Sequence, residues 1–253
     1  LASFEFLLPP LREQALLLEA LLAAQNTAES LRHLNESTRI VRTATFMELL
    51  DNANAVPTQI GSLLTSSPRN GYSAVAASAP TGHWVLALSA ISQSGYRPNQ
   101  FKPVEPSPEI LAARITKGDL VVSRSNTRDL VGLPMVFPED RDDVSYPDTM
   151  MRIPVDPGKV STEFLELCLR TSQCRRQVQS YAAGTNSSML KINGANLKKV
   201  EVPLVDLDTQ MSIVSSVAKF SDLLRAGEQR FTTARSLQAR LANSAVESQP
   251  GES

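Results

Sequence analysis

The strongest constraint on the fold is a segment that opens the chain and returns near its end. Residues 4–22 read FEFLLPPLREQALLLEALL, and residues 200–218 read VEVPLVDLDTQMSIVSSVA. In each copy a short apolar run meets proline, and a glutamine then precedes apolar residues at helical spacing. Gln14 and Gln210 are equivalent positions. The repeat predicts two similar helices that are entered through the same kind of joint.

The apolar residues after each glutamine recur at alternating steps of four and three, which keeps one narrow seam on a helix. The equivalent seam positions are Leu17, Leu21, Ala24, Ala28 and Leu31, and then Ile213, Val217, Phe220, Leu224 and Gly227. The second series continues through Phe231, Ala234, Gln238 and Leu241. The first is expected to slip and to resume at Leu34, Thr38, Val41 and Thr45.

These series predict long helices over residues 11–50 and 206–243. A small core cannot bury so long a seam, so each helix needs a long partner, and an antiparallel coiled coil between the two is the simplest solution. Two separate amphipathic helices in a bundle are the alternative. Residues 244–253 are expected to form a disordered tail.

Residues 51–205, here called the central domain, have a different chemistry. Short β-rich runs at residues 84–88, 119–123, 132–137 and 150–155 predict strands. One helix is expected over residues 160–182, with Ser161 as its N-cap. The sequence therefore predicts an α+β fold, with a central domain on a twisted mixed sheet flanked by two long helices that form an antiparallel coiled coil.

The charge distribution is uneven. The net charge of −1 argues against a nucleic-acid partner, but residues 52–104 and 167–200 contain no Asp or Glu. The second stretch carries six cations: Arg170, Arg175, Arg176, Lys191, Lys198 and Lys199. A polyanion binds through local positive potential, so the two stretches are compatible with one basic face. An ordinary solvated surface is the alternative.

Signals for catalysis are missing from the sequence. Neither GxxxxGK[ST] nor GxGxxG occurs, and the Asn/Asp-Pro-Pro-aromatic motif of adenine methyltransferases and a G-x-S-x-G elbow are also absent. Cys168 and Cys174 are expected to be buried free thiols, and neither His33 nor His83 has a plausible set of metal-binding neighbours. We therefore expect no catalysis, cofactor or metal. No apolar run is long enough to span a bilayer, so no membrane contact is expected.

Three polar loops carry the side chains that suit DNA. They are residues 66–73, 123–128 and 184–188. Arginine and asparagine read base edges in the major groove, while hydroxyls and lysines suit phosphates. The candidate base contacts are Arg69, Asn70, Tyr72, Arg124, Asn126, Arg128, Asn186 and Ser187. The candidate phosphate contacts are Thr185, Ser188, Lys191, Lys198 and Lys199. In the alternative reading, Tyr72 belongs to the core and Asn126 only caps a turn.

Several of these segments resemble one protein family. GDLVVSRSNTRDLVG, residues 118–132, resembles a recurrent motif of the target-recognition domains in the specificity (S) subunits of type I restriction–modification systems. Residues 183–210, with Ala183-Gly184-Thr185, Val202-Pro203-Leu204 and Gln210, are similar to that family's exit from the domain into a long helix. Residues 8–14, LPPLREQ, match the same exit. The resemblance covers nearly the whole chain.

The resemblance implies a non-catalytic subunit that reads double-stranded DNA and holds two recognition domains apart on paired helices. It implies assembly with adenine methyltransferase (M) subunits and a restriction (R) subunit in the cytoplasm of a bacterium or archaeon, at the nucleoid. Only one complete recognition domain is present, and residues 1–10 resemble the last strand of a preceding one. The second half is thus expected in the same chain or in a homodimer, and a fused methyltransferase polypeptide is a third possibility. A coiled-coil module that binds protein without DNA specificity is the alternative function.

Overall fold

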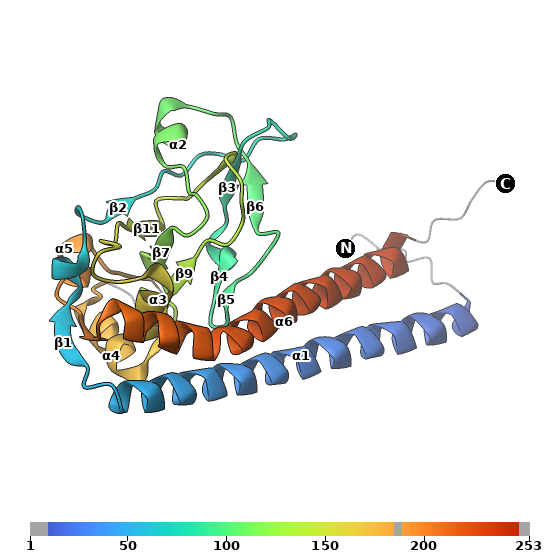
Figure 1. The fold of residues 1–253 in the computed structure, drawn as a ribbon. Helices are drawn as coiled ribbons and strands as arrows, with labels where there is room; N and C mark the ends of the chain where they lie inside the picture. Colours follow the sequence, from blue (N-terminus) through green and yellow to red (C-terminus); the bar gives the residue numbers. More distant parts are fainter. Residues whose placement is uncertain (1–9, 185–188, 248–253) are drawn as a thin grey trace.

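Two long helices lie side by side and antiparallel, and the central domain sits on one end of the pair (Figure 1). They are α1 (Leu11–Asp51) and α6 (Leu207–Glu247), each of 41 residues. The structure, a computed structural model, describes residues 10–184 and 189–247. The predicted antiparallel pair and the α+β class are confirmed. Helix α6 continues to Glu247 rather than ending at residue 243, and residues 248–253 lie outside the described part.

The seam on α6 follows the prediction. Ile213, Val217, Leu224 and Ala234 are buried in the register that the repeat defines. Each of these residues faces α1 or the core of the central domain, because a step pattern of four and three returns to the same side of a helix. The spacing of apolar residues in the second copy of the repeat was therefore sufficient to predict which side of α6 is buried.

The expected slip in the seam of α1 is wrong. Leu34 and Val41 are 59% and 48% exposed, whereas Asn35 and Arg42 are buried. The steps of four and three simply continue through these polar residues, in register with the unbroken seam of α6. A Cβ atom added to Gly227 would lie 1.9 Å from Asn35 Oδ1, so the glycine makes room for the amide between the helices.

The central domain begins and ends on neighbouring strands. Strand β1 (Val56–Gln59) follows α1 and pairs antiparallel with β13 (Glu201–Leu204), which precedes α6. This pairing brings the end of α1 beside the start of α6, as the antiparallel packing of the two helices requires (Figure 1). The two prolines of these strands, Pro57 and Pro203, lie opposite each other.

The other strands form several small sheets rather than one. A four-stranded antiparallel sheet has the order β2 (Arg69–Asn70), β11 (Met150–Ile153), β7 (Leu120–Ser123) and β9 (Pro134–Val136). A mixed sheet holds β10 (Val144–Ser145), β3 (Trp84–Leu86) and β6 (Phe101–Pro103). Two-stranded pairs join β12 (Leu190–Lys191) to β8 (Ser125–Asn126), and β4 (Ile91–Ser92) to β5 (Gly95–Tyr96). Short helices complete the domain: η1 (Ile60–Leu63), η2 (Leu88–Ala90), α2 (Pro108–Ala112) and α5 (Gly194–Leu197).

The single helix predicted over residues 160–182 is divided in two. Helix α3 (Thr162–Arg170) has the expected N-cap, because Ser161 Oγ accepts a hydrogen bond from Phe164 N at 3.1 Å. Helix α4 (Ser172–Tyr181) then starts anew after Thr171, which has extended backbone angles. The Thr171 hydroxyl donates to Cys168 O at 2.7 Å and accepts from Cys174 N at 3.3 Å. One side chain thus ends α3 and caps α4, a local competition that apolar spacing does not reveal.

The central domain and the helix pair share one hydrophobic core. Phe46 of α1 packs edge-to-face on Phe164 of α3, with ring centroids 5.7 Å apart. Ile213 and Val217 of α6 belong to the same buried cluster. The domain is therefore packed directly onto the helices. Within residues 10–184 and 189–247, no helix is long and apolar enough to cross a membrane.

Candidate nucleic-acid interface

Two of the three predicted polar loops meet at a turn that lies outside all three loops in the sequence. This turn, residues 147–149, joins β10 to β11. On one side of the turn, Tyr72 N donates to Tyr146 O at 3.0 Å. On its other side, Arg124 N donates to Thr149 O at 2.7 Å, and Arg124 Nη1 donates to Asp148 O at 3.1 Å. Segments far apart in the sequence thus form one surface.

A glycine permits this close approach. A Cβ atom added to Gly71 would lie 2.0 Å from Tyr146 O and 2.5 Å from Pro147 O. Both neighbours are backbone atoms of the chain that forms the turn, so they cannot rotate away as a side chain can. Gly71 therefore fixes how closely the loop with Arg69, Asn70 and Tyr72 approaches the turn.

The strand that follows the third loop in the sequence, β12, lies at the same surface. Lys191 of β12 pairs with Ser125 of β8, and Ile192 N donates to Arg124 O at 3.0 Å. Lys191 is exposed beside Arg124. The predicted contacts Thr185, Asn186, Ser187 and Ser188 lie outside the described residues. We call the surface formed by residues 69–73, 124–128, 147–149 and Lys191 the polar face.

The side chains of the polar face differ in their freedom to bind a ligand. Tyr72 is 45% exposed, which excludes the core position considered for it. Arg69, Asn70 and Arg128 are also exposed. Asn126 is half-buried, and its Oδ1 accepts from the backbone N of the next residue, Thr127, at 2.9 Å. Arg124 is half-buried against the 147–149 turn.

Lys198 and Lys199 are not joined to the polar face by a described contact. Lys198 O accepts from Gly61 N at 2.9 Å, and Gly61 lies in η1. Helix α5, which precedes these lysines, packs through Gly194 against Pro68, next to Arg69. Lys199 is exposed and Lys198 half-buried. The structure thus places both lysines beside η1, at the edge of the loop that leads to the polar face.

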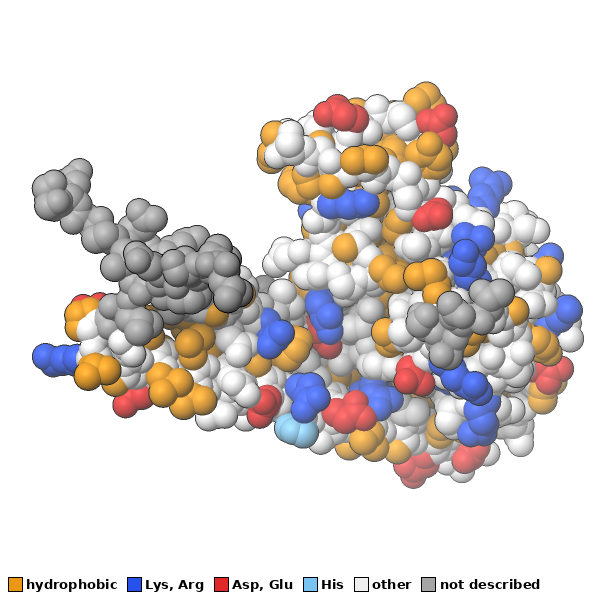
Figure 2. All heavy atoms as spheres, turned by 180° about the vertical axis from the view of Figure 1, so that it is seen from behind, with side chains coloured by type: hydrophobic (Ala, Val, Ile, Leu, Met, Phe, Trp, Pro, Cys, Tyr) orange, Lys and Arg blue, Asp and Glu red, His pale blue; other side chains and the backbone are white. Residues whose placement is uncertain are grey.

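An acid lies where the sequence suggested an acid-free surface. Asp148 is exposed in the 147–149 turn, between the polar loops of residues 66–73 and 123–128. Its carboxylate accepts a hydrogen bond from the Ser73 hydroxyl. Figure 2 shows Lys and Arg side chains on the central domain interspersed with Asp and Glu. The acid-free stretches therefore do not produce an acid-free face. Only the pairing of β2, β11 and β7 reveals that Asp148 belongs here.

A second polar cluster joins the β4–β5 hairpin of the central domain to α6. Arg97, which follows β5, donates from Nε to Glu228 Oε2 at 2.9 Å, and Ser92 Oγ donates to Glu228 Oε1 at 3.2 Å. Arg170 of α3 donates to the carbonyls of Ser92 and Gln93 at 3.3 and 2.8 Å. The β4–β5 hairpin is thus tied both to α3 and to the long helix α6.

The duplicated glutamine has a clear structural role at the joint. Gln210 is fully buried, and its Oε1 accepts from Ser161 N at 3.0 Å. Its Nε2 donates to Lys159 O and Val205 O, both at 2.9 Å. One side chain therefore connects the strand exit, the start of α3 and the first turn of α6.

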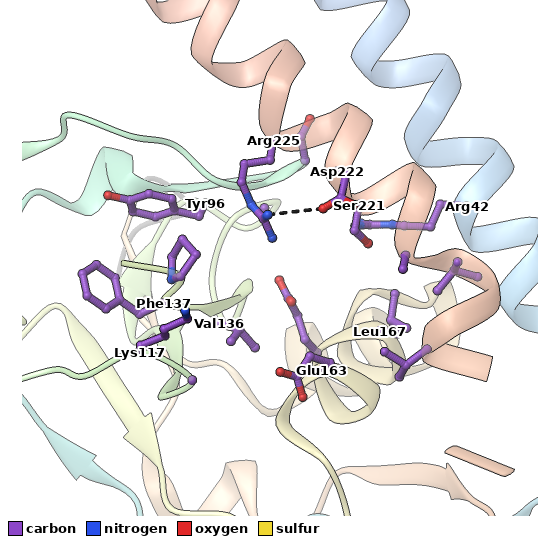
Figure 3. A pocket seen from close by; sticks show the side chains of 18 residues that line it. Arg42, Tyr96, Lys117, Val136, Phe137, Glu163, Leu167, Ser221, Asp222 and Arg225 are labelled. Atoms are coloured by element: carbon purple, nitrogen blue, oxygen red, sulfur yellow. Dashed lines mark hydrogen bonds and ion pairs between the residues drawn. The ribbon is translucent and has the colours of Figure 1, made fainter. Parts of the chain in front are cut away.

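A cavity of about 400 Å³ lies between the helices, α3 and the sheet (Figure 3). Arg42, Asp222 and Arg225 come from the helices, and Glu163 comes from α3. Arg225 pairs with Asp222 at 3.3 Å. Burial, and next the positive charge of the nearby Arg170, lowers the pKa of Arg42 to about 10. No group of three His, Cys, Asp or Glu suited to a metal is found among the described residues.

Comparisons with known proteins point to one kind of relative. No protein-family model matches the chain. The specificity subunit of the type I restriction enzyme EcoEI from Escherichia coli is 22% identical over 163 residues, which are 63% of this chain and 27% of that relative. The chain thus matches only about a quarter of the length of this curated relative.

The fold has solved counterparts. The S subunit of a type I restriction–modification system from M. genitalium superposes with a TM-score of 0.55 at 13% identity, over 95% of this chain and 62% of that one. The HsdS subunit from Thermoanaerobacter tengcongensis gives a TM-score of 0.48 at 13% identity, over 95% and 59% of the two chains. In sequence and in fold, the chain is thus similar to the specificity subunits of type I restriction–modification systems.

Proposed function

We propose that this chain recognises a specific sequence in double-stranded DNA and reads one half of a bipartite site. The observation that carries the proposal is the convergence of two polar loops and Lys191 on the 147–149 turn. This convergence collects guanidinium, amide, phenol and ammonium groups on one exposed surface, which is the mixture that base edges and phosphates require. The similarity to a specificity subunit supports the same function.

The proposed role of the helix pair is to set the distance between two reading surfaces. The central domain packs on α6 through its core and through Glu228, so its position along the helix is fixed. Two 41-residue helices are about 60 Å long at 1.5 Å per residue. A rigid spacer of this length holds two recognition domains apart on separate parts of one duplex.

Helix α1 carries exposed leucines at the positions where α6 packs against the central domain. Leu11, Leu18 and Leu22 are 81%, 57% and 48% exposed. By the repeat, they correspond to Leu207, Val214 and Ala218 of α6, which are half-buried beneath the central domain. We therefore propose that another recognition domain, in the same polypeptide or in a second copy of the chain, covers these leucines.

In this proposal the chain is a non-catalytic subunit, and the chemistry belongs to its partners. Adenine methyltransferase subunits, and a restriction subunit that joins them, would assemble on the helices and the recognition domains. The protein would act in the cytoplasm, where the DNA is. The absence of nucleotide-binding and nucleophile motifs from the sequence is in accord with this division of roles.

A salt titration of DNA binding tests the proposal. Binding through several phosphates releases counterions, so the affinity of the chain with its methyltransferase partner should fall steeply and linearly on a log–log plot of affinity against salt. It should also be higher for a selected duplex than for a scrambled one at every salt concentration. Absence of DNA binding even with the methyltransferase present would instead support a coiled-coil module that binds protein.

A further inference from the structure

We propose that Asp148 reads an exocyclic amino group of a base, the N4 amino group of a cytosine in the major groove. This inference rests on the proposed function, because it needs the polar face to meet DNA. It assigns a specificity-determining role to a residue outside the polar loops that the sequence singled out. The carboxylate lies in the middle of the polar face, between the loop of Tyr72 and the loop of Arg124.

The backbone and side chain of Asp148 are held from both sides. Its carbonyl oxygen accepts from Arg124 Nη1 at 3.1 Å, and its amide donates to Ser73 Oγ at 3.3 Å. The Ser73 hydroxyl in turn donates to Asp148 Oδ1. An exposed side chain on a short turn is ordinarily free to change rotamer. Here the Ser73 hydroxyl holds the carboxylate in one rotamer. The conformational entropy of this side chain is therefore already reduced before any ligand binds.

The charge of Asp148 determines which partner it suits. A carboxylate gains nothing from phosphates, so its presence on a DNA-binding surface weakens non-specific affinity. An ionised carboxylate only accepts hydrogen bonds, and it has about four acceptor sites, of which Ser73 occupies one on Oδ1. The residue is exposed, so a ligand can approach the carboxylate.

Only some base edges satisfy such an acceptor. Guanine presents two acceptors in the major groove, and thymine an acceptor and a methyl group, so both are disfavoured beside a carboxylate. Adenine presents its amino group next to the N7 acceptor, a pair that an amide side chain matches better. Cytosine presents the N4 amino donor alone, which is the edge that Asp and Glu suit. Asp148 is therefore expected to favour cytosine and to exclude guanine.

Ser73 is a positioning residue in this arrangement. Its hydroxyl bonds both the amide and the carboxylate of Asp148. Replacement of Ser73 by alanine leaves the charge in place but frees the rotamer. The discrimination should then be weaker than in the wild type, although the preferred base should be the same.

The test uses the full chain together with its methyltransferase subunits. Bound duplexes are selected from a random pool, and affinities are then measured for duplexes that differ from the selected sequence by a single base pair. The proteins compared are the wild type, Asp148→Asn, Ser73→Ala and, as a control, Asp140→Asn, which neutralises an exposed acid in the segment between β9 and β10. Asp148→Asn should lose about tenfold in discrimination at one cytosine, the effect of one good base contact. It should also bind unrelated DNA more tightly, whereas Asp140→Asn should keep the preferred sequence.

Two outcomes separate this inference from the function on which it rests. If the wild type selects a sequence and Asp148→Asn selects it with unchanged discrimination, or with a uniform change at all positions, the role of Asp148 is refuted and the proposed function stands. If the wild type selects no sequence at all, the proposed function itself fails, and the role of Asp148 fails with it.

Discussion

Arg97 Nε lies 2.9 Å from Glu228 Oε2, and this ion pair joins the central domain to the long helix α6. The Glu228 side chain is only 6% exposed and that of Arg97 is 29% exposed. Arg97 also lies 5.7 Å from the centroid of the Phe231 ring. The pair thus ties the β4–β5 hairpin to the helix at a point distant from the shared core around Phe164. Two separated attachments restrict rotation of the domain about its joint more than one attachment can.

Replacement of Glu228 by glutamine should destabilise this attachment. The variant leaves Arg97 without its anion, while an amide can still accept from Ser92. Because Arg97 is partly screened by solvent, we expect a loss of about 1–3 kcal/mol in the free energy of unfolding, measured with urea. The exposed pair between Asp222 and Arg225 provides the control, and Asp222→Asn should change stability by less than about 0.5 kcal/mol. Equal effects of the two variants would contradict a special role for Glu228.

Gly71→Ala should separate the first polar loop from the 147–149 turn. The added Cβ atom would lie 2.0 Å from the carbonyl oxygen of Tyr146, so the backbone must move. We expect a loss of about 1–3 kcal/mol in unfolding free energy, as for other overpacked sites, together with weaker DNA preference. Gly158→Ala is the matched control, because its added Cβ approaches only the side chain of Asp156, at 3.3 Å. A neutral Gly71→Ala would show that the loop does not need this approach.

Arg42→Leu should stabilise the protein. Arg42 is buried, and its Nε and Nη2 have no hydrogen-bond partner among the residues that the structure describes. Leucine removes the buried charge and adds an apolar residue to the seam, so the free energy of unfolding should rise by about 1–3 kcal/mol. Arg39→Leu, which removes the surface pair with Glu36, is the control and should have little effect. A large loss of stability in Arg42→Leu would show that the guanidinium is needed between the helices.

Stability should fall as the pH is lowered through the usual range of histidine. His83 is buried, and its Nε2 lies 2.9 Å from Ser145 Oγ. Burial, and next the positive charge of Arg114, lowers the pKa of His83 below its ordinary value of 6.5. As the pH falls, the unfolded chain therefore takes up its proton first, and the native state loses stability from about pH 7 downward until its own imidazole titrates.

Urea unfolding between pH 7.5 and 5.5 measures this loss. In His83→Gln the pH dependence in this window should be much smaller than in the wild type. His33→Gln removes an exposed imidazole from α1 and should leave the slope as it is. A slope that persists in His83→Gln would assign the titration to another group.

The spacing of residues in the sequence was enough to predict both long helices and the buried seam of α6, but not all of the seam of α1. Apolar residues occupy most positions of the α6 seam, whereas in α1 the polar Asn35 and Arg42 occupy two consecutive buried positions. Local spacing then favoured Leu34 and Val41, which are exposed. What decides between the two registers is the opposing helix, because Gly227 accommodates Asn35. This information lies nearly two hundred residues away in the chain.

The polar face was only partly predictable for a similar reason. Arg69 and Arg124 could be identified from the chemistry of their loops, but nothing local shows that both loops approach one turn. That turn carries Asp148, which lies outside the two acid-free stretches of the sequence. Pairing of β2 with β11, and of β11 with β7, brings the three segments together. Such non-local pairings are the part of the fold that a single sequence specifies least directly.

The most direct test of the account is whether DNA selected by this protein has one preferred half-site, and whether Arg124 reads part of it. The measurement is selection from random duplexes, with affinities at fixed salt for the wild type, Arg124→Ala and Arg124→Lys. We predict one defined half-site for the wild type. We also predict a loss of about 1–3 kcal/mol in binding free energy, with relaxed preference at one base, in Arg124→Ala. Arg124→Lys should restore only part of it, because lysine lacks the planar fork of donors of the guanidinium. Selection of no consensus, or the same affinity and preference in all three proteins, would contradict the account.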